Sequence, residues 1–278
     1  MAPEEASEEA HDPEDARLLD LALVTAREAG ELVVALRERG VAVAATKSSP
    51  VDVVTAADRA CEELIRERLL DARPGDGFIG EEGADVQSTS GVSWVVDPID
   101  GTVNYLYGIP HYAVSIAAVR GDRAVAGVVR NPAAEVEYAA LLGGGATCNT
   151  AALRVRSTPP LAQALIGTGF GYETRARARQ ARAAARMLPQ VRDIRRQGSC
   201  ALDLCAVAAG MLDAYVEEGP HIWDHAAGAL VAAEAGARVE VWTTAASMEL
   251  VVAAPEDGWS AFSALVRDCG YLDDSSML

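Results

Sequence analysis

Residues 94–108 read WVVDPIDGTVNYLYG, and they join a hydrophobic run to two acids, Asp97 and Asp100. The run Trp94–Val96 is typical of a buried strand, so the two carboxylates stand where a strand ends. Burying one carboxylate costs free energy, and a second one nearby adds charge repulsion. A divalent cation removes both penalties, and Mg²⁺ prefers a few oxygen ligands around an open cavity. The stretch therefore raises the prospect of a metal site.

The residues between and after the two acids fit this interpretation, although they also fit a simpler one. Pro98 restricts the backbone and lacks an N–H, which leaves carbonyl groups free to point inward. Gly101 and Thr102 offer backbone N–H groups that would bind a phosphate if a helix begins there. On the other hand, Asp-Pro and Asp-Gly are common turn dipeptides, so this stretch alone leaves both readings open.

Two other acidic stretches also stand beside predicted elements. Glu81 and Glu82 follow a short apolar run, although an isolated Glu-Glu pair is normally a solvated loop. Asp224 stands where a helix is predicted to begin, and its plainest role is an N-cap. His225 beside it is expected to lie on the surface at the start of that helix. Taken one at a time, each stretch has an ordinary structural explanation.

The composition limits the class of protein. The chain has 278 residues, of which half are hydrophobic, and its 41 acids against 24 bases give a net charge of −17. This balance argues against nucleic acid or an anionic membrane as the main partner, and we find no basic stripe. No apolar run approaches the ~18 residues of a membrane span. Five scattered cysteines without a C-x-x-C predict free thiols and a cytoplasmic location.

Helical and strand-like patterns alternate without strict β-α-β order. Residues 1–15 are acidic and predict a disordered tail. Helices are expected over 16–39, 55–71, 174–187, 199–210 and 223–236, and again after Pro255. Strands are expected over 78–79, 92–96, 112–120, 124–130, 136–142, 165–169, 193–196, 213–216, 237–241 and 249–253, with a polar loop at 47–50 and a tight loop at 143–145. This predicts a layered α+β fold, not a Rossmann sheet or a barrel.

Three motifs in this order resemble the signature of the inositol monophosphatase family: GEEG (80–83), WVVDPIDGT (94–102) and WDHAAGALVAAEAG (223–236). Lys47 with DVVTAAD (52–58), and Gly198-Ser199 with DAYVE (213–217), are similar to further family segments. The resemblance covers residues 18–254 and is strongest to bacterial inositol-1-monophosphatases. It implies a layered α-β-α-β-α sandwich, shared with fructose-1,6-bisphosphatase. It also implies a Mg²⁺-dependent, lithium-sensitive phosphatase that forms a homodimer. We expect a single phosphatase domain over 16–278, with a metal and phosphate side at 16–157 and a substrate side at 158–278.

The resemblance assigns a role to each matched position. Glu81, Asp97 and the Ile99 carbonyl would bind one Mg²⁺, and Asp97, Asp100 and Asp224 a second, with a third ion near Glu81 also possible. Thr102 and Glu81 would orient or deprotonate the attacking water, with Asp58 hydrogen-bonded to Thr102. The substrate would contact Glu81, Ile99, Asp100, Asp224, the amides of Gly101 and Thr102, backbone groups of Gly198, Ser199 and Cys200, and Glu217.

Some positions depart from the family pattern. Cys200 stands where the family usually has Ala, and it is either a small buried apolar residue or a thiol that faces the pocket. Residues 234–238 lack the second glycine of the usual E-A-G-G, and 242–247 lack the usual D-x-x-G. The roles of Arg195 and Arg196, at a dimer interface or at the rim of the core, stay open.

The leading hypothesis is hydrolysis of myo-inositol 1-phosphate by a metal-activated water. The alternatives keep this chemistry on fructose-1,6-bisphosphate, histidinol phosphate or a 3′-phosphonucleotide. A hypothesis of a different class is an accessory protein of the RNA and transcription machinery.

Overall fold

The computed structural model describes residues 12–40, 43–46 and 53–273. Its α-helices are α1 (Pro13–Glu38), α2 (Ala56–Ala72), α3 (Thr102–Tyr107), α4 (Thr174–Met187), α5 (Cys200–Ala208), α6 (Ile222–Glu234) and α7 (Trp259–Asp268), with short 3₁₀ helices η1 (Leu161–Gln163) and η2 (Leu188–Gln190). In the described part of the chain, no helix is both long and apolar enough to cross a bilayer.

Two large sheets organise the strands. The first sheet contains, in spatial order, β3 (Gly77–Gly80), β4 (Val92–Asp100), β5 (Ala113–Arg120), β6 (Arg123–Asn131), β7 (Val136–Leu141), β8 (Gly145–Cys148) and β9 (Ala151–Ala152). It is antiparallel except for the β3–β4 pair. The second contains, in spatial order, β11 (Asp193–Arg195), β10 (Leu165–Thr168), β12 (Ala214–Glu218), β14 (Glu249–Pro255) and β13 (Ala237–Thr243). A separate hairpin pairs β1 (Val43–Thr46) with β2 (Val53–Thr55).

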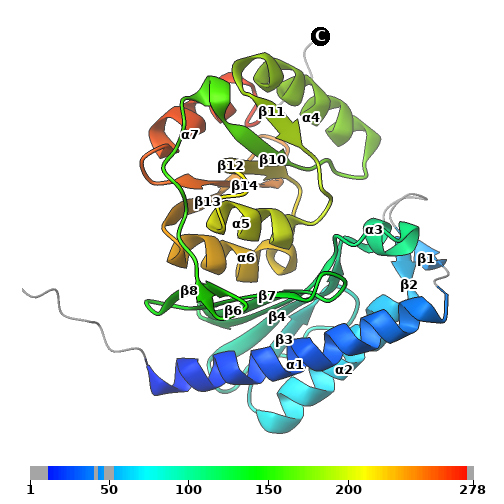
Figure 1. Cartoon of the computed structure of the whole chain (residues 1–278). Coiled ribbons are helices and arrows are strands. Elements are labelled where there is room, and N and C mark those ends of the chain that lie inside the picture. The colour runs from blue at the N-terminus through cyan, green and yellow to red at the C-terminus, as the bar shows by residue number, and fades with distance from the viewer. Residues whose placement is uncertain (1–11, 41–42, 47–52, 274–278) are drawn as a thin grey trace, which may run out of the picture.

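The helices lie in three layers around these sheets. As Figure 1 shows, α1 and α2 cover one face of the first sheet, and α5 and α6 lie between the two sheets. Helices α4 and α7 cover the outer face of the second sheet. This is the predicted α-β-α-β-α sandwich, so the predicted α+β fold class is confirmed.

Small residues explain how α6 fits into the middle layer. The motif WDHAAG begins in its first turn, and a Cβ on Gly228 would lie 2.9 Å from the Ala201 carbonyl oxygen of α5. On the sheet side, a Cβ on Gly127 would lie 3.1 Å from Ala227. A helix covered on both faces is mostly apolar, and every residue of α5 is buried, including one acid, Asp203, which accepts from Gln197. The close packing of α6 fixes where Asp224 stands relative to β4.

The structure corrects several sequence predictions. The predicted tail extends too far, because Asp12 caps α1 and Pro13–Asp15 are helical, with Asp15 paired to Arg120 at 2.9 Å. Strand β4 runs through the predicted turn to Asp100. The predicted tight loop ends at Gly145, where β8 begins, and β8, β9, β1 and β2 were all missed. The predicted loop at 47–50 and tail residues 1–11 lie outside the described residues.

The division into two sub-halves stays a prediction. The predicted boundary near Ser157–Pro160 falls between β9 and β10, where the chain passes from one sheet to the other. Helices α5 and α6 follow this point in the sequence but also pack against β4, β5 and β6.

Candidate metal centre and active site

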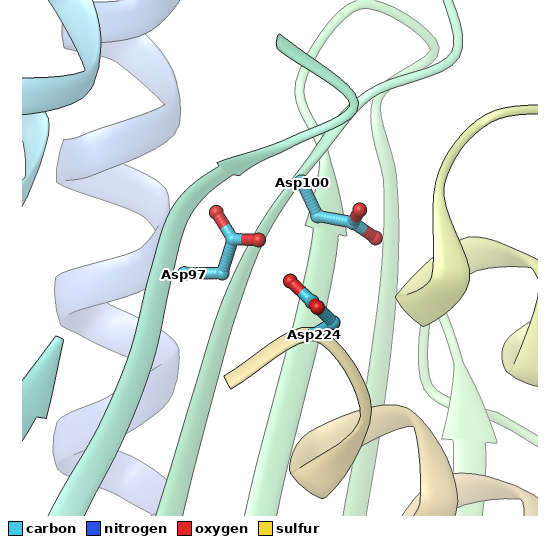
Figure 2. A group of neighbouring side chains, drawn as sticks. All are labelled: Asp97, Asp100 and Asp224. Atoms are coloured by element: carbon cyan, nitrogen blue, oxygen red, sulfur yellow. The ribbon is translucent and has the colours of Figure 1, made fainter. Parts of the chain in front are cut away.

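Three aspartates from two elements meet between the sheets. Asp97 and Asp100 end β4, and Asp224 lies in the first turn of α6. One carboxylate oxygen from each residue lies within 4.8 Å of the other two. Figure 2 shows the three side chains turned toward a shared space. Asp97 and Asp100 are only 2% and 8% exposed, so this space contains a concentrated and largely dehydrated negative charge.

A bulge in β4 brings Asp97 and Asp100 together. Side chains alternate along a strand, so residues three apart normally point to opposite faces. Here Asp97 pairs with Ser115 and Asp100 with Ala113, so three steps on β4 oppose two on β5. The extra residue returns the second carboxylate to the side of the first. The Ile99 N–H donates to Asp97 Oδ1 at 2.9 Å, which fixes the bend. The DPID sequence therefore forms a bulge within a strand.

Asp100 and Asp224 each accept hydrogen bonds at the start of a helix. The Ser199 hydroxyl and the Ala201 N–H donate to Asp100 Oδ2 at 2.6 and 2.7 Å, where α5 begins. The His221 N–H donates to Asp224 Oδ2 at 2.6 Å. His221 is thus the N-cap of α6 and Asp224 its third residue, so the N-cap reading of Asp224 is wrong. Helix N-termini favour negative charge, and this offsets part of the cost of the cluster.

Burial and repulsion shift the titration of all three groups. Desolvation raises the pKa of Asp97 well above its ordinary value, and the charges of Glu81, Asp100 and Asp224 raise it further. Burial likewise raises the pKa of Asp100 to about 7, against hydrogen bonds from Ser199 and Ala201 that lower it. The pKa of Asp224 is also raised well above its ordinary value by burial and by Asp100.

The donor set fits a hard divalent cation. Among the described residues, no Lys, Arg or His side chain forms an ion pair with Asp97, Asp100 or Asp224. Buried carboxylates without a counter-charge are unfavourable in isolation, and carboxylate oxygens are the ligands that Mg²⁺ takes. Glu81, which follows β3, is close enough for its charge to raise the pKa of all three aspartates. It is the fourth acid of this site.

Thr102 connects this cluster to α2. Its hydroxyl lies 3.0 Å from Asp58 Oδ1 and 3.1 Å from the Ile99 carbonyl oxygen. Asp58 is fully buried and also accepts from the Thr55 N–H (2.8 Å) and hydroxyl (2.5 Å) in a capping box that starts α2. Desolvation raises the pKa of Asp58 despite these hydrogen bonds. Asp58 lies behind Thr102, so it acts on the cavity through the threonine.

A cavity of about 410 Å³ opens above the acids. Of the predicted site residues, it is lined by Glu81, Asp97, Ile99, Asp100, Gly101, Thr102, Gly198, Cys200, Glu217 and Asp224. Gly101 has φ 96°, a conformation that suits glycine, and its Cβ would meet the Gly198 carbonyl oxygen at 3.0 Å. The phosphate side and the substrate side of the predicted site therefore touch at these two glycines.

Two predicted site residues do not line the cavity. Asp58 lies behind Thr102, and the Ser199 hydroxyl is occupied by Asp100 and by the Leu202 N–H. Glu217 does line the cavity, and its Oε2 accepts a hydrogen bond from the Tyr215 hydroxyl at 2.5 Å. A Cβ on Gly169 would lie about 2.0 Å from the Glu217 carboxylate, so glycine is required there.

The sequence interpretation missed part of the wall. Arg196 lines the cavity. Its place, two residues before Gly198, could have suggested this. Burial raises the pKa of Glu217, and the hydrogen bond from Tyr215 and the charge of Arg196 oppose this rise. Trp223, the first residue of the WDHAAG motif, also lines the wall, as do Phe170 and Tyr172, which no sequence motif marked. His225 is 8% exposed and lies 3.1 Å from Glu249, so its predicted surface position is wrong.

The Cys200 side chain belongs to the cavity wall and is 6% exposed. Burial raises the pKa of its thiol well above the ordinary value, and the charges of Glu217, Asp100 and Asp224 act in the same direction. All five cysteines are free, as predicted.

Comparisons with known proteins agree with this geometry. A family model described as the inositol monophosphatase family matches residues 14–267. The chain is 52% identical over 233 residues to the inositol-1-monophosphatase SuhB of Mycobacterium tuberculosis, covering 80% of each. It is 39% identical over 232 residues to a Pseudomonas aeruginosa protein named Nus factor SuhB, covering 81% of this chain and 86% of that one. The solved structure of Mycobacterium tuberculosis SuhB superposes with a TM-score of 0.81 at 45% identity, covering 94% of this chain and 100% of the other.

Proposed function

The chain belongs to the inositol monophosphatase family of metal-dependent phosphomonoester hydrolases, and we propose that it converts myo-inositol 1-phosphate to myo-inositol and phosphate with Mg²⁺. The observation that carries this proposal is the cluster of Asp97, Asp100 and Asp224 on the floor of the cavity. A net charge of −17 would repel a phosphate dianion, and cations bound by these acids would reverse the sign locally.

The acids divide into two overlapping ligand sets. Glu81, Asp97 and the Ile99 carbonyl would hold one ion, and Asp97, Asp100 and Asp224 a second; a third near Glu81 completes the expected range of two or three ions. When bound, such ions polarise the phosphate and make a water molecule acidic enough to attack at neutral pH.

The side chains around the acids position the reactants. The Thr102 hydroxyl donates to Asp58, so its oxygen is oriented to accept a hydrogen bond from the attacking water. Glu81, on the opposite loop, would take the proton of this water. The amides of Gly101 and Thr102 would hold a phosphate oxygen, because no side chain caps the first turn of α3. Positioning of this kind supplies much of the rate enhancement in phosphoryl transfer.

The opposite wall would bind the polyol. Glu217, fixed by Tyr215, presents a carboxylate that would accept from a substrate hydroxyl. Gly198 and Cys200 line the same cavity, and backbone groups at Gly198, Ser199 and Cys200 would complete this wall. Asp100 and Asp224 would also contact hydroxyl groups near the leaving oxygen. A volume of about 410 Å³ falls within the range of small-molecule sites.

A substrate panel tests the proposal. Phosphate release from myo-inositol 1-phosphate, fructose-1,6-bisphosphate, histidinol phosphate and a 3′-phosphonucleotide would be measured with Mg²⁺, without it, and with added Li⁺. We expect the highest kcat/KM on the inositol ester, no release without metal, and inhibition by Li⁺. Asp224→Asn is the inactive control. Release from the inositol ester no faster than that control would reject the proposal. A higher kcat/KM on another ester would reassign the substrate. The cytoplasmic location stays a prediction.

We also propose a homodimer. Met211 (56% exposed) lines a second cavity, and Ile109 (48% exposed) directly precedes Pro110 of the same lining. Exposed apolar side chains beside a cavity suit an interface. Light scattering on a size-exclusion column is expected to give a dimer mass, and Ile109→Asp a monomer mass. A monomeric wild-type protein would reject this.

One observation favours a second function. Helix α4 contains five arginines and no acid, and Arg175, Arg182 and Arg186 are exposed along one side of it, at i, i+7 and i+11. Arg179, at i+4 of the same row, is paired with Glu218. The sequence prediction of no basic stripe stays a prediction, but this face of α4 is locally basic although the whole chain is acidic. Arginines on a helix suit phosphate groups of a nucleic acid. The relative named as a Nus factor is consistent with a role beside the RNA machinery.

Single-stranded RNA tests this second function. Fluorescence anisotropy across a salt series would compare the wild type, Arg175→Ala/Arg182→Ala, and a charge-matched control, Arg59→Ala/Arg154→Ala, on other exposed surfaces. The helix variant is expected to lose affinity and to reduce the salt slope by about 1–2, and the control to change neither. Equal effects of both variants would show that RNA binds through non-specific charge and not through α4, and would reject this second function.

A further inference from the structure

The carboxylate of Glu62 lies against the loop that carries Glu81. Glu62 belongs to α2 and is 4% exposed. Its Oε2 accepts the N–H of Glu82 at 2.8 Å, and the N–H of Gly83 also contributes a hydrogen bond to this carboxylate. One side chain therefore binds two consecutive backbone groups directly after Glu81.

The two glycines of the GEEG motif are explained by this carboxylate. A Cβ on Gly80 would lie 2.5 Å from Glu62 Oε2, and a Cβ on Gly83 would lie 2.6 Å from Glu62 Oε1. Both distances are shorter than real Cβ contacts allow, so larger residues would displace either the loop or Glu62. The loop is built to close around the carboxylate, with Glu81 at its turn.

Arg66 holds the other side of the same loop. It stands one helical turn after Glu62, donates to the Ala84 carbonyl oxygen at 2.6 Å, and its guanidinium lies 4.7 Å from the centre of the Phe78 ring. Asp58, Glu62 and Arg66 recur every four residues, so one stripe of α2 faces the site. The first of them meets Thr102, and the other two meet the Glu81 loop.

We propose that Glu62 is a positioning residue that fixes the Glu81 side chain in the cavity and thereby sets the Mg²⁺ affinity of the site. The inference rests on the proposed function only in taking Glu81 as a metal ligand. Glu81 lines the cavity, whereas Glu62 does not, so Glu62 acts through the backbone of 82–83. Side chains that orient metal ligands typically change metal affinity by about 10–100-fold when they are removed.

The experiment compares Glu62→Ala and Glu62→Gln with Glu63→Gln, an exposed glutamate one position along the same helix. Mg²⁺ binding to metal-free protein would be measured by calorimetry without substrate, and amide hydrogen exchange over residues 80–84 would be followed in the same metal-free samples. We expect Glu62→Ala to weaken Mg²⁺ binding about 10–100-fold and to speed exchange at Glu82 and Gly83. Glu62→Gln, which keeps one acceptor oxygen, should show a smaller loss, and Glu63→Gln none.

Steady-state kinetics separates positioning from simple loss of structure. At saturating Mg²⁺, Glu62→Gln should recover most of the wild-type kcat while its Mg²⁺ requirement stays raised. A variant that is less heat-stable yet binds Mg²⁺ with wild-type affinity would overturn the inference. If Glu62→Ala does not fold, the same comparison is decided on Glu62→Gln. A wild type that binds Mg²⁺ but releases no phosphate from any ester would reject the proposed function and leave this inference standing.

Discussion

Two groups of buried acids in this fold have opposite surroundings. Glu218, 2% exposed under α4, is paired with Arg179 at 2.6 Å and also accepts from Gln180. Asp97, Asp100 and Asp224 lie together, and none of them is ion-paired with a cationic side chain of the described residues, although Arg196 lines the same cavity. A buried carboxylate with its counter-charge in place is part of the structure, whereas a cluster without one is incomplete until a cation arrives. The same charge change should therefore have opposite consequences at the two places.

The largest effect is expected at Asp97, which belongs to both proposed ligand sets. Asp97→Asn should lower kcat/KM by at least about 10³-fold, or about 4 kcal/mol of transition-state stabilisation. It should not lower the unfolding temperature of the metal-free protein, because it removes repulsion from Glu81, Asp100 and Asp224. Kinetics and calorimetry on the same preparation check this. A destabilised metal-free variant would show that Asp97 is a structural acid like Glu218.

Sequence patterns predicted the layered fold and the meeting of the three aspartates, but not how they meet. Each motif is a short stretch of sequence, so Asp97, Asp100 and Asp224 could be identified as site residues without knowledge of the fold. The bulge that aligns the first two depends on pairing with β5, and the place of Asp224 depends on the small residues of α6 against Gly127 and α5. Arg196 and the burial of His225 are set by contacts between distant segments, which no local pattern encodes. The Glu62 contact was missed for the same reason.

The second effect is a pH dependence of the metal-free protein. The pKa of Asp100 is about 7 in the folded state, against 3.8 ordinarily, so the folded state holds more protons between these values. The free energy of unfolding should fall as pH rises through this window, by up to about 4 kcal/mol for a pKa rise of about three. Saturating Mg²⁺ stabilises the charged form and should abolish the fall.

Urea denaturation at pH 5, 6 and 7, with a chelator or with Mg²⁺, measures this difference. The Asp97→Asn variant is a control in which the fall should be smaller, since fewer acids repel one another. Metal-free stability that rises between pH 5 and 7 would contradict the uncompensated state of the cluster.

A smaller effect is expected at Glu218, where the substitution should lower stability rather than activity, the reverse of Asp97. Glu218→Gln keeps the shape but leaves Arg179, whose side chain is 13% exposed, without its counter-charge. The free energy of unfolding should fall by about 3 kcal/mol. Glu218 also lines the cavity, but its carboxylate is bound by Arg179 and Gln180 and belongs to neither proposed ligand set, so the kcat of the folded fraction should stay near that of the wild type. A large loss of kcat at full folding would show that Glu218 acts on the substrate or on the metal as well as on Arg179.

The smallest effect concerns Cys200, a neutral group beside the cluster. Cys200→Ala removes one buried sulfur and should cost about 1 kcal/mol of stability, with little change in kcat/KM. Burial, and after it the charges of Glu217, Asp100 and Asp224, raise the pKa of this thiol, so the metal-free protein should resist iodoacetamide at pH 7. Bound Mg²⁺ would reduce this negative field. Rapid inactivation of the metal-free wild type, absent in Cys200→Ala, would mean that the cavity stabilises a thiolate without any metal. The charges of Asp97, Asp100 and Asp224 would then already be compensated in the metal-free protein. These aspartates would not differ from Glu218, whose charge is compensated by Arg179.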